Sequence, residues 1–125
     1  MKIRLEGGLL FVTATLRYAG RELILEQVLL DTGSGGSVFA ADDVLRLGLL
    51  PEPEDPILRI RGIGGTEYVF SKELDALRLG FIEVDAFKIQ VGALDYGFQL
   101  QGILGLDFLL QAGTVIDLKE LEIRS

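Results

Sequence analysis

The stretch Val28-Leu29-Leu30-Asp31-Thr32-Gly33-Ser34 decides how the rest of the chain is interpreted. An apolar, strand-like run delivers an acid to the loop DTGSGGS, residues 31–37, which holds three glycines and two serines. Two interpretations of Asp31 follow from these residues alone. It is either an acid placed for chemistry, or a loop or N-cap residue whose carboxylate satisfies nearby backbone N–H groups. The remainder of the sequence has to decide between them.

Composition limits the chemistry that is open to the chain. It has 125 residues, a formal net charge of −7, no His and no Cys. The length fits a single domain over residues 1–125. The absence of His and Cys excludes Ser-His-Asp and Cys-His nucleophile pairs, disulfides, and metal sites built on imidazole or thiolate. An enzyme built from this sequence has to work mainly with carboxylates, hydroxyls, Lys or Arg.

The same composition narrows the class of partner. An acidic chain is poorly suited to nucleic acid, because phosphate binding needs a basic face. No run approaches the 18 apolar residues that a membrane helix needs, and residues 1–8 lack the pattern of a signal peptide. We therefore expect a cytoplasmic protein without nucleic-acid or membrane partners. The acids are not grouped at ligand spacing, so no metal and no cofactor is expected.

Hydrophobic residues make up 49% of the chain and glycines number 16. Together these exceed the usual share for a soluble domain. Either some apolar surface is buried against another chain, or the core is rich in leucine.

Alternating and β-branched segments predict a mostly β fold with two short helices. Residues 9–18 and 21–30 form the first expected hairpin, and residues 40–48 a short helix. A second hairpin, residues 57–70, has the tip Gly62-Ile63-Gly64-Gly65. Two further strands are expected over residues 74–82 and 84–92, followed by a loop over residues 92–102. Residues 103–113 run from a buried strand end into a helix closed by Gly113, and a last hairpin turns around Lys119-Glu120.

A second motif favours the interpretation of Asp31 as an acid placed for chemistry. Ile103-Leu104-Gly105 is an apolar pair ending in glycine, and the glycine-tipped hairpin lies between it and the DTGS loop. In this order of elements the chain resembles the retropepsin-like, single-domain aspartic proteases, in particular their bacterial branch. DTGS and ILG match as they stand, GIGG matches as a flap tip, and residues 9–124 agree in pattern. The resemblance implies an all-β, closed-barrel retropepsin-like fold with one or two short helices.

The resemblance also implies a homodimeric aspartic endopeptidase acting on an extended peptide or an unstructured protein segment. Two carboxylates about 3 Å apart cannot both ionise, so they share a proton and supply a base and an acid together. The chain holds one Asp-[Ser/Thr]-Gly sequence and therefore half of such a dyad. Asp31 would meet the Asp31 of a second copy across a two-fold axis.

The neighbouring residues take roles from the same resemblance. Thr32 would hydrogen-bond across the two-fold axis, Gly33 would let two backbones approach, and Ser34 would donate a hydrogen bond to the ionised Asp31. Ile103 and Leu104 would pack beneath the loop, with Gly105 giving clearance. Asp107 is expected to cap the helix that follows it. Apolar residues facing the substrate are expected to be the following: Val38, Ile63, Ile82 and Leu104.

The tip formed by Gly62, Ile63, Gly64 and Gly65 would be a flap that closes over bound peptide. The alternative is an ordinary glycine-rich turn. For the whole chain, the alternatives are a non-catalytic peptide-binding or scaffold domain that keeps the protease fold, and a proteolytic module that is active only with a partner.

Overall fold

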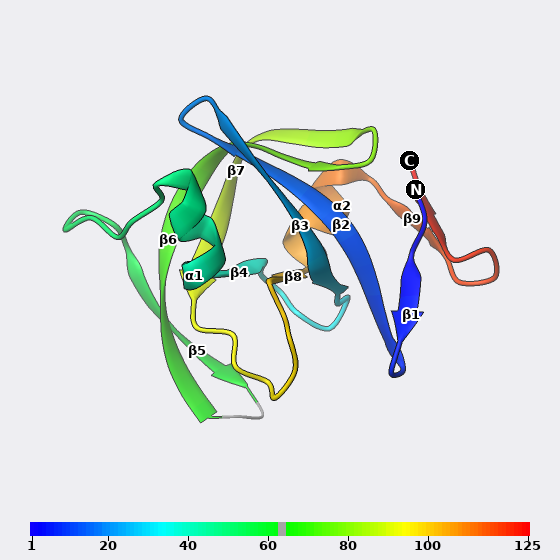
Figure 1. Ribbon diagram of the computed structural model, residues 1–125, viewed down its shortest axis with the longest axis horizontal. Coiled ribbons are helices and arrows are strands. Elements are labelled where there is room, and N and C mark those ends of the chain that lie inside the picture. The colour runs from blue at the N-terminus through cyan, green and yellow to red at the C-terminus, as the bar shows by residue number, and fades with distance from the viewer. Residues whose placement is uncertain (63–64) are drawn as a thin grey trace.

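A ring of six strands organises the molecule in the computed structural model, which describes residues 1–62 and 65–125 (Figure 1). β2 (Leu9–Tyr18) pairs with β3 (Arg21–Leu30), and β3 lies parallel to β8 (Gly102–Leu104). β8 pairs with β4 (Val38–Ala40), and β4 lies parallel to β7 (Ile82–Gly92). β7 pairs with β6 (Gly65–Leu79), which returns to β2 and closes the barrel. β1 (Arg4–Glu6) flanks β2, and β5 (Ile57–Gly62) flanks β6.

The first hairpin follows its sequence pattern closely. β2 and β3 have the predicted bounds, and the turn between them places Ala19 and Gly20 at φ 51° and 77°. Glycine adopts this left-handed region without a steric penalty. The pairing shifts by one residue between Val12 and Ala14, which marks a β-bulge in the strand that leads to Asp31. A bulge of this kind bends its strand and re-aims the residues beyond it.

The barrel interior is filled by the alternate residues of its strands. Val12, Leu25, Leu77 and Ile89 are fully buried, and helix α2 (Leu106–Ala112) adds Phe108. The rings of Phe87 and Phe108 meet edge to face with centroids 5.4 Å apart. Such a pair adds to the free energy gained by apolar burial, so α2 is fixed against β7.

The two predicted helices are present and short. α1 (Ala41–Val44) continues into the 3-10 turn η1 (Leu45–Leu47), and Gly48 ends it with φ 74°. α2 ends at Gly113, whose φ is 66°. The expected all-β barrel with two short helices is therefore confirmed.

Two strand predictions need correction. Residues 65–70 and 74–79 are one continuous strand, β6, and the following turn lies at Gly80-Phe81 rather than at Glu83. A strand that crosses from the flanking hairpin into the barrel needs no break in its backbone pairing. β1 was not predicted, because three residues with two charges carry little strand signal.

The chain ends lie side by side (Figure 1). β9 (Val115–Asp117) and β10 (Glu122–Arg124) form the predicted C-terminal hairpin. The β10 side of this hairpin also pairs with the N-terminal residues. Ile3 N–H donates to Leu121 O and Ile123 N–H donates to Met1 O, both at 2.8 Å. The terminal residues thus complete a small sheet within one chain.

A buried lysine ties the 51–56 connection to β6. Lys72 is only 7% exposed, and its Nζ lies 2.6 Å from Glu52 Oε1 and 2.9 Å from Asp55 Oδ2. Burial disfavours the charge of Lys72, but the hydrogen bonds to both carboxylates outweigh this and raise its pKa. The hydrogen bond from Lys72 also lowers the pKa of Glu52 and of Asp55. The base of the β5–β6 hairpin is therefore held by charge as well as by backbone pairing.

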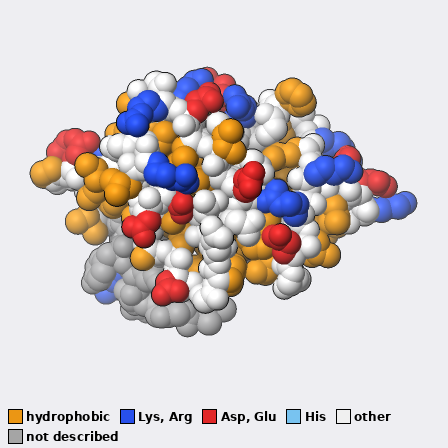
Figure 2. Space-filling model, viewed as in Figure 1, with side chains coloured by type: hydrophobic (Ala, Val, Ile, Leu, Met, Phe, Trp, Pro, Cys, Tyr) orange, Lys and Arg blue, Asp and Glu red, His pale blue; other side chains and the backbone are white. Residues whose placement is uncertain are grey.

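The face shown in Figure 2 carries acidic and basic side chains interspersed with hydrophobic ones. Within residues 1–62 and 65–125, no helix is long and apolar enough to cross a membrane.

Candidate active site

Asp31 lies where β3 ends, and its own loop and strand β8 fix its backbone. Its N–H donates to Leu104 O at 3.0 Å, which extends the parallel pairing of β3 and β8 by one residue. Its carbonyl accepts from Ser34 N–H at 3.2 Å, and its Oδ1 accepts from Gly33 N–H at 2.9 Å. The side chain is half-buried. A carboxylate is thus presented at the surface with a defined orientation.

Thr32 and Gly33 are exposed at the outer edge of this loop. A Cβ on Gly33 would lie 3.2 Å from Asp31 Oδ1, so within one chain a side chain there meets mainly the carboxylate itself. The contacts expected of both residues across a two-fold axis stay predictions.

The prediction for Ser34 is wrong. Its hydroxyl donates to the carbonyl of Gly36 at 2.7 Å and not to Asp31. The loop curls back on itself after the turn, so the nearest acceptor is a backbone carbonyl two residues on. A serine hydroxyl has one proton to donate, so this contact leaves none for the carboxylate.

The ILG segment supports the loop from below. Leu104 is fully buried in the barrel, and Gly105 lies against the loop backbone. A Cβ on Gly105 would be 2.4 Å from Gly36 O and 2.7 Å from Ser34 O. The clearance role predicted for Gly105 is confirmed. The substrate-facing positions proposed for Leu104 and Ile82 are wrong, because both pack with the barrel core.

Asp107 has a different partner from the one predicted. The N-cap of α2 is Gly105 and not Asp107, which lies in the first turn and whose Oδ1 accepts from Phe108 N–H at 2.8 Å. The Asp107 carboxylate also accepts from Ser37, from its N–H at 3.1 Å and from its Oγ at 2.7 Å. Sequence reasoning missed Ser37, because its partner lies 70 residues away in the chain. The first turn of α2 is thereby tied to the end of the DTGSGGS loop.

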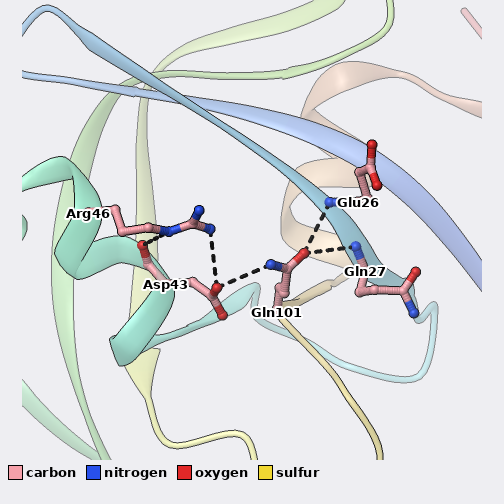
Figure 3. A network of polar contacts seen from close by, with 5 residues as sticks. All are labelled: Glu26, Gln27, Asp43, Arg46 and Gln101. Carbon is pink, nitrogen blue, oxygen red and sulfur yellow. Dashed lines mark hydrogen bonds and ion pairs between the residues drawn. The ribbon is translucent and has the colours of Figure 1, made fainter.

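Gln101 holds the bulge that precedes Asp31 (Figure 3). Its Oε1 accepts from the N–H groups of Glu26 and Gln27, at 3.1 and 3.0 Å. Its Nε2 donates to Asp43 Oδ1 at 3.1 Å, and Arg46 reaches the same oxygen at 3.3 Å. One amide therefore satisfies the donors that the bulge removes from the sheet and joins them to α1. No local pattern in the sequence indicates this role.

A second apolar cluster lies on the outer face of β2, β3 and β8. Phe11, Leu100 and Ile103 are buried there, and Leu29 packs against them. Side chains alternate along a strand, so Asp31 follows Leu29 on this face rather than on the core face. The rings of Phe11 and Phe98 meet edge to face at 6.4 Å. This buried cluster therefore supports the end of β3 that carries Asp31.

The hairpin of β5 and β6 carries the residues proposed as a flap. Gly62 pairs with Gly65 in the antiparallel register, while Ile63 and Gly64 lie outside the described residues. A shallow pocket of about 550 Å³ lies beside Gly35 and Gly36, and polar side chains of β6, β7 and α2 line it together with Ala86 and Phe87. It flanks the loop but does not include Asp31. Val38, also proposed to face substrate, is 5% exposed.

Comparison with known proteins agrees with this geometry. A family model described as aspartyl protease matches residues 14–108, which include the Asp31 loop, the β5–β6 hairpin and the ILG segment. No curated protein matches the chain.

Proposed function

The chain belongs to the aspartyl protease family, and we propose on that premise that it is a homodimeric endopeptidase formed from one domain per subunit. The observation that carries the proposal is the placement of Asp31. It is a half-buried acid at the end of β3, and the Gly33 N–H orients its carboxylate. Each chain holds one such loop, so two chains are needed for a pair of carboxylates.

The chemistry follows from two carboxylates that share one proton. The ionised Asp31 takes a proton from a water molecule, whose oxygen attacks the scissile carbonyl carbon. The protonated Asp31 of the other subunit donates a hydrogen bond to the carbonyl oxygen as negative charge develops there. A proton then passes to the leaving nitrogen, the C–N bond breaks, and an acid and an amine are released. No cofactor takes part in these proposed steps.

A preference for apolar side chains beside the scissile bond rests on Ile63, the apolar residue of the proposed flap. Burying one such side chain of a substrate contributes about 1.5–3 kcal/mol. The hairpin with Gly62, Ile63, Gly64 and Gly65 would close over the peptide and exclude water. We therefore propose as substrate an extended peptide or an unstructured protein segment.

The decisive experiment compares the purified protein with Asp31→Asn on a set of unstructured peptides with varied apolar residues. Asparagine cannot act as the base or share the proton, so cleavage should be abolished while fold and dimer persist. Asp95→Asn is the matched control, since Asp95 also follows a leucine and lies in an exposed loop with a nearby glycine. It should retain full activity.

The two-chain site has its own test in the same assay. The rate per chain should fall on dilution through the range where mass measurements show the dimer dissociating. Cleavage by Asp31→Asn would refute the role of Asp31, and a constant rate per chain in a purely monomeric sample would refute the dimer. A protein that binds these peptides but never cleaves them would be the non-catalytic alternative.

A further inference from the structure

The segment 104–107 holds the catalytic loop at three points. Asp31 N–H donates to Leu104 O at 3.0 Å, and Leu106 N–H donates to Ser34 O at 2.8 Å. These two contacts involve only backbone atoms. The third joins Ser37 to the Asp107 carboxylate and depends on two side chains.

Ser37 is the most completely fixed residue of this loop. It is 1% exposed, and its hydroxyl donates to Asp107 Oδ1 at 2.7 Å while accepting from Gly105 N–H at 3.0 Å. Its N–H donates to Asp107 Oδ2 at 3.1 Å, and its carbonyl accepts from Gln90 N–H at 2.9 Å. Hydrogen bonds to a charged acceptor are roughly twice as strong as neutral ones. Asp107 thus supplies the strongest contacts at the far end of the loop.

The residues between the two ends explain why such an anchor matters. Gly33, Gly35 and Gly36 give the loop a backbone with few steric restraints. Strand β3 fixes its start, and a flexible loop keeps its shape only if its end is fixed as well. A displacement of about 1 Å at a reacting group costs on the order of 100-fold in rate.

We propose that Asp107 is a positioning residue for the peptidase site, which acts by fixing Ser37 and through it the loop that carries Asp31. The inference rests on the proposed function for its catalytic readout. Asp107 does not touch the reacting atoms. It differs from a purely structural acid because its loss should change turnover more than substrate binding.

The central variant is Asp107→Ala, which removes both acceptors of Ser37. kcat should fall about 10- to 100-fold, because the shape of the Asp31 loop is no longer fixed. KM should stay within about twofold, because the β5–β6 hairpin that we propose to close over the peptide belongs to other elements. Asp107→Asn keeps one acceptor oxygen and should give an intermediate kcat. If Asp107→Ala does not fold, Asp107→Asn is the variant whose kcat tests the proposal.

Asp117→Ala is the matched control. Asp117 accepts hydrogen bonds from the N–H groups of Lys119 and Glu120, both at 3.0 Å, and from Arg124 at 2.8 Å. Asp107 also accepts three hydrogen bonds, two from Ser37 and one from Phe108 N–H at 2.8 Å, so the two variants lose equal numbers of contacts in different places. The melting temperature should fall in both variants, and kcat only in Asp107→Ala.

Ser37→Ala tests whether the two residues act as one unit. It should lower kcat, and the double variant with Asp107→Ala should lose less than the product of the two single losses. Independent, fully multiplicative losses would refute a shared contact. A folded, dimeric Asp107→Ala with the kcat of the unmodified protein would overturn the proposal, and so would an equal loss of kcat in Asp117→Ala.

Hydrogen exchange separates this inference from the proposed function. If the unmodified protein cleaves no peptide, the peptidase proposal fails. The structural role of Asp107 can still be decided from the hydrogen-exchange rates of the backbone amides of Asp31, Ser34 and Gly105. Faster exchange of these amides in Asp107→Ala than in Asp117→Ala supports an anchor for the loop. Equal exchange in the two variants overturns it.

Discussion

Gly105→Ala tests the contact between α2 and the Asp31 loop by adding a single methyl group. Gly105 has φ −98° and ψ −174°, an extended conformation that alanine adopts freely. The cost is therefore steric and not a backbone penalty. The new Cβ would lie 2.4 Å from Gly36 O and 2.7 Å from Ser34 O, whereas carbon and oxygen normally approach to about 3.3 Å. Loop and helix have to separate by roughly 1 Å.

The magnitude follows from what that separation disturbs. Overpacking costs about 1–3 kcal/mol. The hydrogen bonds Leu106 N–H to Ser34 O, at 2.8 Å, and Gly105 N–H to Ser37 Oγ, at 3.0 Å, would stretch or break. Each contributes about 1 kcal/mol. Replacing glycine by alanine stabilises the folded state by about 0.4–1 kcal/mol, because it lowers the conformational entropy of the unfolded chain. We expect a net loss of about 2–4 kcal/mol, or roughly 8–16 °C in melting temperature for a chain of this length.

The assay is thermal unfolding followed by circular dichroism at one fixed protein concentration, because a dimer melts in a concentration-dependent way. Gly35→Ala is the control. It lies in the same loop, and a Cβ there has no atom within 4 Å. It should melt within about 3 °C of the unmodified protein, since a change of less than 1 kcal/mol is expected. If Gly105→Ala also melts within that range, the close packing of α2 on the loop is refuted.

Two further predictions concern the β5–β6 hairpin. Lys72→Met should lower the melting temperature at pH 7. Lys72 holds the pKa of Glu52 and of Asp55 below the usual range, so the stability that the ion pairs add is present above about pH 4 and is lost as the pH falls further. The melting temperatures of Lys72→Met and the unmodified protein, measured from pH 7 to pH 2, should therefore converge at the acid end. A difference in melting temperature that stays constant with pH would contradict the ion pairs. Gly64→Val should lower kcat/KM at least about tenfold if the hairpin tip closes on substrate. Gly20→Val, in a turn outside the site, should mainly lower stability because Gly20 has φ 77°, and equal losses of activity in both variants would mean an ordinary turn.

Local patterns predicted most of the barrel because its strands alternate clearly. The β2–β3 hairpin, α1 and the C-terminal hairpin lie where the sequence placed them. β6 was divided in two, since Ser71, Lys72 and Glu73 interrupt the apolar pattern of the sequence, although the backbone pairing with β7 continues through them. β1 is held by pairing with β2, through contacts such as Leu5 with Leu10, rather than by its own propensity. Tertiary pairing decided both cases.

The site was predictable to the extent that its chemistry is contained in short motifs. Asp31 and Gly105 follow from DTGS and ILG, whose strands lie side by side because β3 and β8 are parallel neighbours. The polar contacts around them were not predictable in the same way. A hydroxyl in a glycine-rich loop has many possible acceptors, and the sequence does not say which one lies near.

The two serines of the loop show what decides such contacts. Ser34 is three residues from Asp31, yet its hydroxyl donates to Gly36 O, because a turn presents a nearby carbonyl first. Ser37 is six residues from Asp31 and finds Asp107, 70 residues away, because β8 carries α2 to the end of the loop. Proximity in sequence favoured the first serine as the residue that contacts Asp31. In the fold it is Ser37 that is buried and has a charged partner for both its N–H and its hydroxyl. Because charge-assisted hydrogen bonds are the stronger kind, we expect this contact to restrain the loop more than the bond from Ser34 to Gly36 O does.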